Sequence, residues 1–146
     1  MTRPLRLVAL ALVFTALAVP AASAADRPFK GHASGVIQAF PDPIAGTPGV
    51  VQYTGQATHL GRFTRTEYFN FDGFGGIFGT MFFTAANGDR LDLNFDGQFT
   101  PPTAEGTYEI TGGTGRFRDA AGTADFRAVL GPEGRVEVDF AGSIRY

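Results

Sequence analysis

The sequence predicts an all-β protein: an eight-stranded antiparallel up-and-down barrel after a cleaved signal peptide. Apolar residues recur at every second position between turn signals, which is typical of half-buried strands. No segment keeps a 3.6-residue apolar period, so helices are not expected. The chain also contains 20 glycines among its 146 residues, and these divide it into short strands with short connections. Eight such strands can close on themselves and eliminate both sheet edges, whereas an open two-sheet sandwich is the alternative.

Residues 1–24 are predicted to be the signal peptide. Arg3 and Arg6 form a positive n-region, an apolar run of about 13 residues follows from Leu7 to Val19, and Ala22-Ser23-Ala24 offers a cleavage site. The run is shorter than the roughly 20 residues of a membrane-spanning helix, and no second run follows. We therefore expect a secreted or periplasmic protein without a membrane span, with a single barrel domain over 25–146.

Eight segments of the mature chain carry the strand pattern: 29–40, 50–60, 62–71, 77–85, 90–99, 106–111, 122–130 and 135–146. The clearest is 90–99, where Leu91, Leu93 and Phe95 are separated by polar residues. The last segment alternates in the same way. Both are predicted to be antiparallel strands with one face in water.

Turn and loop sequences separate these segments. Ala86-Asn87-Gly88-Asp89 and Gly131-Pro132-Glu133-Gly134 are predicted hairpin turns. The stretch from Pro41 to Gly49 is a predicted loop, because its prolines lack the N–H donors of a central strand.

A glycine-rich corner joins the sixth and seventh segments. Gly112, Gly113 and Gly115 can reach positive φ without a Cβ penalty, so they permit a tight, strongly bent connection. Gly115-Arg116-Phe117 repeats the earlier Gly61-Arg62-Phe63. We expect each phenylalanine to close the barrel end and each arginine to face solvent.

Composition excludes several classes of function. The net charge of −2 becomes about −4 without Arg3 and Arg6, because 12 − 2 = 10 basic residues then face 14 acidic ones, so no nucleic-acid partner is expected. The chain has no cysteine, which excludes disulfides and thiolate chemistry, and only two histidines. No metal and no cofactor are expected.

One motif superficially suggests calcium. Asp92-x-Asn94-x-Asp96-Gly97 matches the first half of an EF-hand loop, but the twelfth position is Thr103 instead of glutamate. Because these residues alternate with apolar ones, the sequence predicts the solvated face of a strand.

The candidate ligand-binding residues are Tyr53, His59, Arg65 and Glu67. Tyr53 and His59 share one face of the second segment, and Arg65 and Glu67 share a face of the third with Phe63, Phe69 and Phe71. If these faces point inward, a few polar groups enter an aromatic-lined lumen, the usual form of a small-molecule site. The alternative is that Arg65 and Glu67 form an outward patch or a satisfied ion pair at the rim.

The segment 77–85 is apolar on both faces. Ile77, Met81 and Phe83 lie on one face, and Phe78 and Phe82 on the other. Such a strand is either covered by the terminal segments or forms a contact in a homo-oligomer.

The glycine corner resembles the G-G-T-G-x-F-R-x-A-x-G signature of dirigent proteins and the related allene oxide cyclase barrels. The matching residues are Gly112, Gly113, Thr114, Gly115, Phe117, Arg118, Ala120 and Gly122. With the blocks Ala57 to Thr64 and Ala86 to Asp89, the chain looks like a secreted bacterial member of this superfamily. Asp42-Pro43 is the counterpart of the dirigent Asp-Pro motif, whereas Asp119 and Ala121 depart from the signature.

The resemblance implies an eight-stranded barrel, frequently trimeric, with an apolar cavity. Dirigent proteins steer the coupling or cyclisation of phenolic intermediates, and the cyclases close an epoxide-derived ring, both without a cofactor. Our leading hypothesis is a secreted, non-catalytic barrel that binds a small apolar or aromatic molecule in its lumen. A dirigent-like or cyclase-like catalyst is one alternative, and a structural, self-associating barrel with a phenylalanine-filled core is another.

Overall fold

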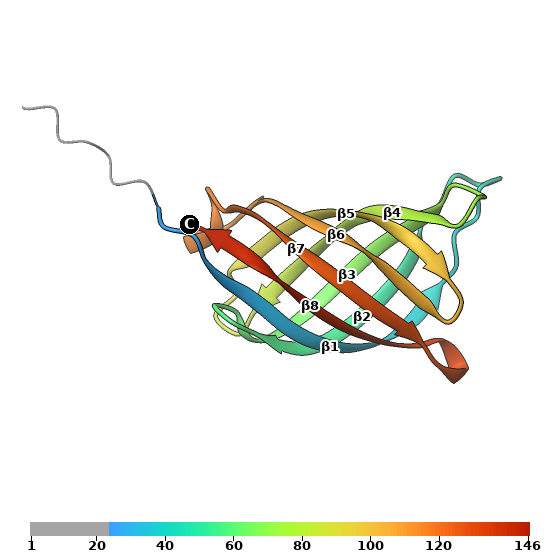
Figure 1. Cartoon of the computed structure of the whole chain (residues 1–146), viewed down its shortest axis with the longest axis horizontal. Helices are drawn as coiled ribbons and strands as arrows, with labels where there is room; N and C mark the ends of the chain where they lie inside the picture. Colours follow the sequence, from blue (N-terminus) through green and yellow to red (C-terminus); the bar gives the residue numbers. More distant parts are fainter. Residues whose placement is uncertain (1–23) are drawn as a thin grey trace, which may run out of the picture.

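The structure, a computed structural model, describes residues 24–146. This part of the chain is a closed antiparallel barrel in which sequential strands pair and β8 pairs with β1 (Figure 1). The strands are β1 (Arg27–Ala39), β2 (Gly49–Ala57), β3 (Gly61–Phe71), β4 (Gly76–Ala85), β5 (Arg90–Thr100), β6 (Thr103–Gly113), β7 (Ala121–Leu130) and β8 (Arg135–Arg145). The predicted barrel is confirmed and the sandwich alternative is wrong. The signal-peptide prediction falls outside the described residues, Ala24 excepted.

Two short 3-10 helices accompany the strands, η1 (Gly115–Phe117) and η2 (Pro132–Gly134). Within residues 24–146, no helix has the length and apolar character needed to cross a membrane.

Strand alternation fills the interior with aromatic side chains. Phe63 and Phe83 pack edge to face with ring centroids 4.8 Å apart, and Phe29 lies 5.1 Å from Phe140. Tyr108 stacks on Phe126 at 4.6 Å. Such aromatic pairs contribute beyond their buried area, so this core can hold a barrel that has no disulfide.

The alternation predicted for 90–99 is confirmed in β5. Leu91, Leu93 and Phe95 are buried in the core. Between them, Asn94 and Asp96 are exposed, and the Asp92 carboxylate accepts a hydrogen bond from Arg90 Nε at 2.5 Å. The residues of the partial calcium motif therefore form an outward polar face.

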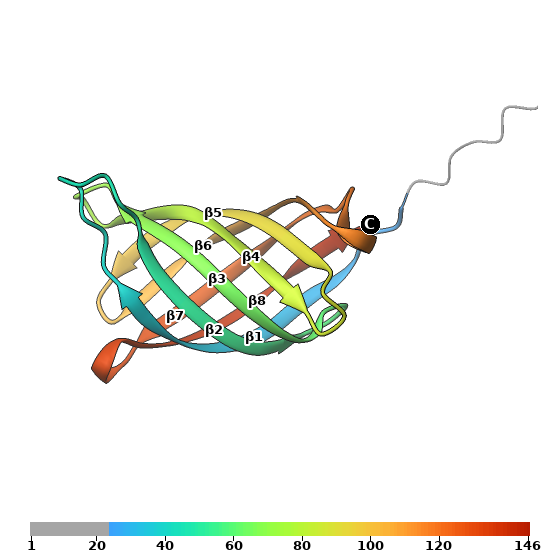
Figure 2. The ribbon, with the colours of Figure 1, turned by 180° about the vertical axis from the view of Figure 1, so that it is seen from behind.

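The two ends of the barrel differ. The mouth end carries loops 40–48, 72–75 and 101–102 and the η2 turn, while the closed end carries turns 58–60 and 86–89, the η1 corner and the C-terminus (Figure 1). Figure 2 shows the opposite side, where β3, β4 and β5 face the viewer. Leu60, Phe117, Ala120 and Ile144 are buried at the closed end. The position of any lumen site is therefore restricted to the mouth half.

The glycine corner adopts the predicted positive-φ conformations. Gly112 has φ 137° and Gly115 has φ 56°. Phe63 and Phe117 are both buried, as predicted. Arg116 is exposed, as predicted, and its NH2 also donates to the carbonyl of His59 at 2.8 Å, which ties the corner to the β2–β3 turn.

Gly115→Val should lower the free energy of unfolding by more than about 1 kcal/mol, since a β-branched residue at positive φ is strained. A Cβ at Gly115 would also lie 2.0 Å from Asp89 Oδ1. Thermal and urea melts measure the loss. Gly46→Val is the matched control, because Gly46 has φ 69° but no atom within 4 Å of its Cβ position. Equal losses in the two variants would show that crowding at the corner is unimportant.

Two predicted boundaries need correction. The second strand ends at Ala57 instead of 60, because Thr58 leaves the sheet: its N–H donates to Lys30 O at 2.9 Å, and its hydroxyl donates to Pro28 O at 3.0 Å. The sixth strand begins at Thr103 instead of 106. Its pairing with β5 resumes directly after Pro101-Pro102, with Thr100 opposite Thr103.

Candidate functional site

A cavity of about 110 Å³ occupies the mouth half of the lumen. Inward residues from all eight strands line it, and most of them are apolar. Its aromatic wall consists of Phe69, Phe71, Phe95, Phe99 and Phe126. A dry cavity of about 150 Å³ holds benzene. At about 110 Å³, this cavity encloses most of one small ring, and the rest of a ligand extends into the mouth.

Four polar residues, Tyr53, Arg65, Glu67 and Tyr108, also line this cavity and form what we call the lumen cluster. Arg65 NH1 donates to the Tyr108 hydroxyl at 2.9 Å, and NH2 donates to Glu67 Oε2 at 2.5 Å. The guanidinium carbon lies 3.8 Å from the centroid of the Tyr53 ring. Arg65 is therefore held on three sides, and only 1% of its surface is exposed.

The position of each member follows from the sheet. Arg65 and Glu67 are two residues apart in β3, so alternation points both into the lumen. Tyr53 is the direct cross-strand partner of Arg65 in β2. Tyr108 comes from β6 and reaches Arg65 across the lumen, 43 residues away in sequence. Barrel closure thus assembles the cluster from three strands.

Burial sets the electrostatics of the lumen cluster. It raises the pKa of Glu67 above its usual range, although the positive charge of Arg65 opposes the rise. Burial raises the pKa of Tyr108 to about 12 and also raises the pKa of Tyr53. For Arg65, burial disfavours the charge, but Tyr108, Glu67 and Tyr53 outweigh it and raise the pKa. Arg65 is therefore a cation and both phenols are neutral at physiological pH.

Three polar atoms of the lumen cluster have no hydrogen-bond partner among the described residues: Arg65 Nε, Glu67 Oε1 and the Tyr53 hydroxyl oxygen. Arg65 Nε is buried without a hydrogen bond, and it is the one buried side-chain nitrogen or oxygen of residues 24–146 in that state. Glu67 uses Oε2 for Arg65, whereas Oε1 accepts no hydrogen bond. With 13% of the Glu67 side chain exposed, Oε1 is not sealed off, so it remains open to a group in the cavity.

The structure brings together three of the four predicted site residues: Tyr53, Arg65 and Glu67. They point into the lumen, which is the first of the two arrangements considered, and Arg65 and Glu67 also form the ion pair of the second, inside the lumen and not at its rim. Tyr108 was missed. Its alternation with Ile110 indicates an inward position, but no local signal shows that it meets Arg65.

His59 is a correction, because it lies at the closed end and does not line the cavity. With β2 ending at Ala57, His59 occupies the following turn with φ 67°. Its Nε2 lies 2.9 Å from the carbonyl of Pro28, and its Nδ1 lies 3.1 Å from the Tyr146 hydroxyl. A carbonyl only accepts hydrogen bonds, so Nε2 carries the proton. His59 therefore fastens both ends of the described chain to the turn.

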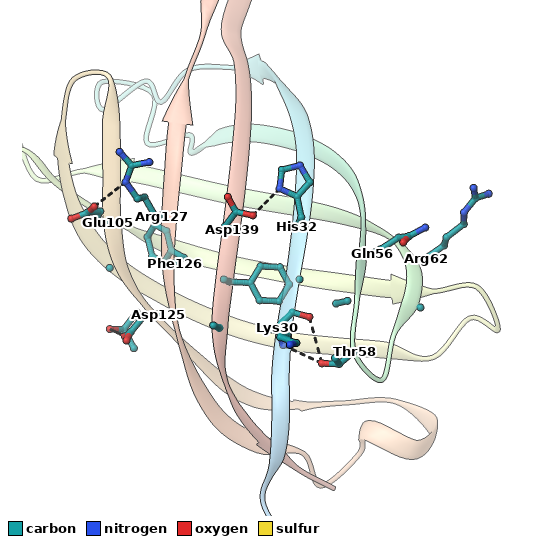
Figure 3. A pocket seen from close by; sticks show the side chains of 17 residues that line it. Lys30, His32, Gln56, Thr58, Arg62, Glu105, Asp125, Phe126, Arg127 and Asp139 are labelled. Atoms are coloured by element: carbon teal, nitrogen blue, oxygen red, sulfur yellow. Dashed lines mark hydrogen bonds and ion pairs between the residues drawn. The ribbon is translucent and has the colours of Figure 1, made fainter.

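A second hollow lies on the outer surface and is shallow and open, with a volume of about 1360 Å³ (Figure 3). Its charged side chains point away from the lumen, and four of its titratable side chains form two pairs. His32 Nδ1 lies 2.9 Å from Asp139 Oδ1, and Arg127 Nε lies 3.2 Å from Glu105 Oε1. Exposed pairs of this kind are worth at most about 1 kcal/mol. We therefore place the candidate site in the enclosed lumen, despite its smaller volume.

No group of three or more His, Asp or Glu side chains is placed to hold a metal ion in the part of the chain that the structure describes. The lumen cluster itself offers one carboxylate and no histidine.

Comparisons with known proteins agree with the barrel architecture. No family model matches the chain. Over 67 residues it is 43% identical to "Dirigent protein 16" of Arabidopsis thaliana, a match that covers 44% of this chain. The matched part spans only about a quarter of that protein, 27% of its length.

Two solved structures are similar in fold. The pterocarpan synthase dirigent protein PsPTS1 has a TM-score of 0.57 at 16% identity, with 85% of this chain and 97% of that chain covered. The pterocarpan synthase dirigent protein GePTS1 has a TM-score of 0.49 at 19% identity, with 88% and 89% covered. The likeness to PsPTS1 in fold and to Dirigent protein 16 in sequence shows that the chain has a dirigent-like barrel.

Proposed function

We propose that this chain is a secreted dirigent-like protein that binds one small apolar or aromatic molecule in its lumen without a cofactor. The observation that carries the proposal is the aromatic-walled cavity open at the mouth, with a single polar cluster among its lining. Concave, mostly apolar sites with a few placed polar groups are the usual form of small-molecule sites. Secretion rests on the signal-peptide pattern of residues 1–24.

A second candidate is a dirigent-like catalyst that needs no cofactor. Both solved neighbours are named as pterocarpan synthases. In this chain, Glu67 is a lumen carboxyl whose raised pKa, caused by burial, brings proton exchange closer to neutral pH. The proposal of a wholly filled structural barrel has less support, because phenylalanines pack the closed half while the mouth half keeps its cavity.

Lumen binding can be tested by filling the cavity. Toluene, titrated by NMR, should bind the wild-type protein, and Ala128→Leu should weaken that binding about tenfold or more by occupying the space. Ala128 lines the lumen cavity, whereas Ala141 lines the outer hollow, so Ala141→Leu is the control and should bind toluene normally. If only Ala141→Leu lost binding, the site would lie outside the barrel. Absence of binding to the folded wild type would contradict the proposal.

We further propose self-association through the outer face of β3 and β4. Phe78 is 46% exposed and Tyr68 beside it is also exposed. Phe82, the other outward phenylalanine, is covered within the chain by Arg90, whose guanidinium carbon lies 4.6 Å from its ring. Phe78 is therefore the residue of this strand that is left for a subunit contact.

Phe78→Glu should dissociate an oligomer of this kind, because the substitution buries an unpaired charge in the contact. Light scattering after size-exclusion chromatography measures the mass of wild type and variant. Ala141→Glu adds the same charge at an exposed site of β8, away from the β3–β4 face, and should leave the mass unchanged. A wild type that is monomeric at high concentration would disprove the contact.

A further inference from the structure

We propose that the mouth end of the barrel binds a lipid surface, and that Ile44 and Phe74 insert from two neighbouring loops into its apolar layer. The contact is peripheral and end-on, since only loop tips enter the lipid. It does not depend on the proposed lumen binding, because it uses the outer surface of the loops.

The exposed apolar side chains gather at one end of the barrel. In the part of the chain that the structure describes, every large hydrophobic residue that is exposed lies in the mouth half, on loops 40–48 and 72–75 or on the adjoining parts of β1, β3 and β4. Ile44 is 98% exposed and Phe74 is 90% exposed, whereas Leu60 in a turn of the closed end is buried. Apolar surface concentrated in this way marks an interaction site.

The two loops lie side by side, because one precedes β2, the other follows β3, and these strands are paired (Figures 1 and 2). Each loop is held by an aspartate two residues before its apolar tip. Asp42 Oδ1 accepts a hydrogen bond from the N–H of Ile44 at 2.9 Å. Asp72 Oδ1 accepts one from the N–H of Phe74 at 2.7 Å. These Asx turns order the loops in advance, so binding does not have to pay for ordering them.

The shape of the tips fits a lipid surface better than a protein partner. A Cβ placed on Gly46 or Gly73, beside the tips, would have no atom within 4 Å, so both loops project into solvent. A stable protein interface takes about 20–30 residues from each side, more than the two loops contain. The boundary between headgroups and acyl chains takes up apolar side chains to a depth of about 5–10 Å without needing a complementary shape.

The charge of the loops favours an electrically neutral lipid. The loops contain Asp42 and Asp72 and no lysine, arginine or histidine. They therefore lack the basic residues that attract anionic headgroups. A two-fold contact between the mouths of two copies would bring the same aspartates toward one another, which is unfavourable. The surface that remains is a zwitterionic one such as phosphatidylcholine.

Attachment through this end turns the lumen toward the bilayer. Phe40 is exposed and also lines the lumen cavity, so the apolar surface of the loops continues into the cavity. An apolar molecule can then pass between lipid and lumen without crossing water.

Tryptophan fluorescence tests the orientation, because the chain contains no tryptophan of its own. With phosphatidylcholine vesicles, Phe74→Trp should shift its emission to the blue and be quenched by brominated phosphatidylcholine, since tryptophan is favoured at the membrane interface. Ala86→Trp is the matched control, an exposed position in a turn of the closed end, and should show neither change. Equal quenching of the two variants, or quenching of neither, would overturn end-on insertion.

Co-sedimentation with the same vesicles measures the contribution of the tips. Ile44→Ser/Phe74→Ser should bind about tenfold or more weakly than the wild type, because two apolar side chains no longer leave water. Higher ionic strength should not weaken wild-type binding, and added phosphatidylglycerol should not strengthen it. All proteins are compared with the same N-terminus, as processed by the cell, so residues 1–24 affect each equally. Circular dichroism checks that the variants are folded.

Three results would contradict the proposal. The wild type could fail to bind the vesicles, or the double variant could bind them as well as the wild type does. The double variant could also show a lower mass than the wild type by light scattering without lipid, which would assign the tips to a contact between copies. Failure of toluene to bind in the lumen would leave the lipid contact standing, so the two proposals fail separately.

Discussion

Arg65→Met should lower the free energy of unfolding by about 3–5 kcal/mol at pH 7, since it leaves the Glu67 carboxylate in the lumen without its cation. It also removes the donor that Arg65 NH1 supplies to Tyr108. The double variant Arg65→Met/Glu67→Met should recover most of this loss, because neither buried charge remains. Urea denaturation of the four proteins of the double-mutant cycle measures the coupling.

The pH dependence of the same variant has a defined sign. Burial already raises the pKa of Glu67 in the native protein, with Arg65 opposing the rise. Without Arg65 the folded-state pKa rises further above the unfolded value, so the relative stability is greatest at low pH and is lost as the pH rises through the folded pKa. The deficit of Arg65→Met should therefore shrink as the pH is lowered from 7 toward 5.

Arg90→Met is the matched control for this cycle. Arg90 and Asp92 have the same two-residue spacing on β5 and the same 2.5 Å separation, but their side chains are 48% and 33% exposed. An exposed pair contributes at most about 1 kcal/mol. A loss in Arg65→Met no larger than that in Arg90→Met would contradict the importance of the buried pair.

Phe117→Ala should cost about 3–5 kcal/mol of stability, the usual cost of truncating a fully buried phenylalanine. Phe117 has no exposed surface and packs 5.1 Å from the Tyr146 ring at the closed end. The truncation leaves a void there that the tied η1 corner cannot readily fill, since Arg116 holds it to His59. Thermal and urea denaturation measure the effect.

Phe74→Ala provides the comparison, because Phe74 lies in a mouth loop and is 90% exposed. That substitution should change stability by no more than about 0.5 kcal/mol. Toluene binding at the mouth half should survive in Phe117→Ala when the protein is kept below its melting temperature. Similar melts for the two variants would show that Phe117 does not seal the barrel.

Several features of the site were predictable because they are local. The two-residue spacing of Arg65 and Glu67 in a strand sets them on one face, and the neighbouring phenylalanines indicate that this face is the inner one. The same periodicity placed Tyr53 inside and Asp92 outside. Each of these assignments needs only the position of the strand and the knowledge of which of its two faces is apolar.

His59 shows where local reasoning failed. Its odd-numbered position matched Tyr53, but the inference required the strand to continue past Ala57. The chain instead turns at Thr58, whose N–H and hydroxyl bond to carbonyls of β1, and His59 takes up a positive φ. Local reasoning also did not identify the group that covers Phe82. That group is Arg90, which lies on the neighbouring strand β5.

By itself the sequence determined the fold class, the eight strands and which residues of one strand share a face, because a strand has a period of two. It also indicated the bent glycine corner, because positive φ favours glycine. Only the tertiary structure decided which inward residues meet. The contact between Arg65 and Tyr108 crosses the lumen from β3 to β6 and depends on the stagger of strands around the closed barrel. That stagger comes from the pairing of all eight strands, a property that no single segment of the chain contains.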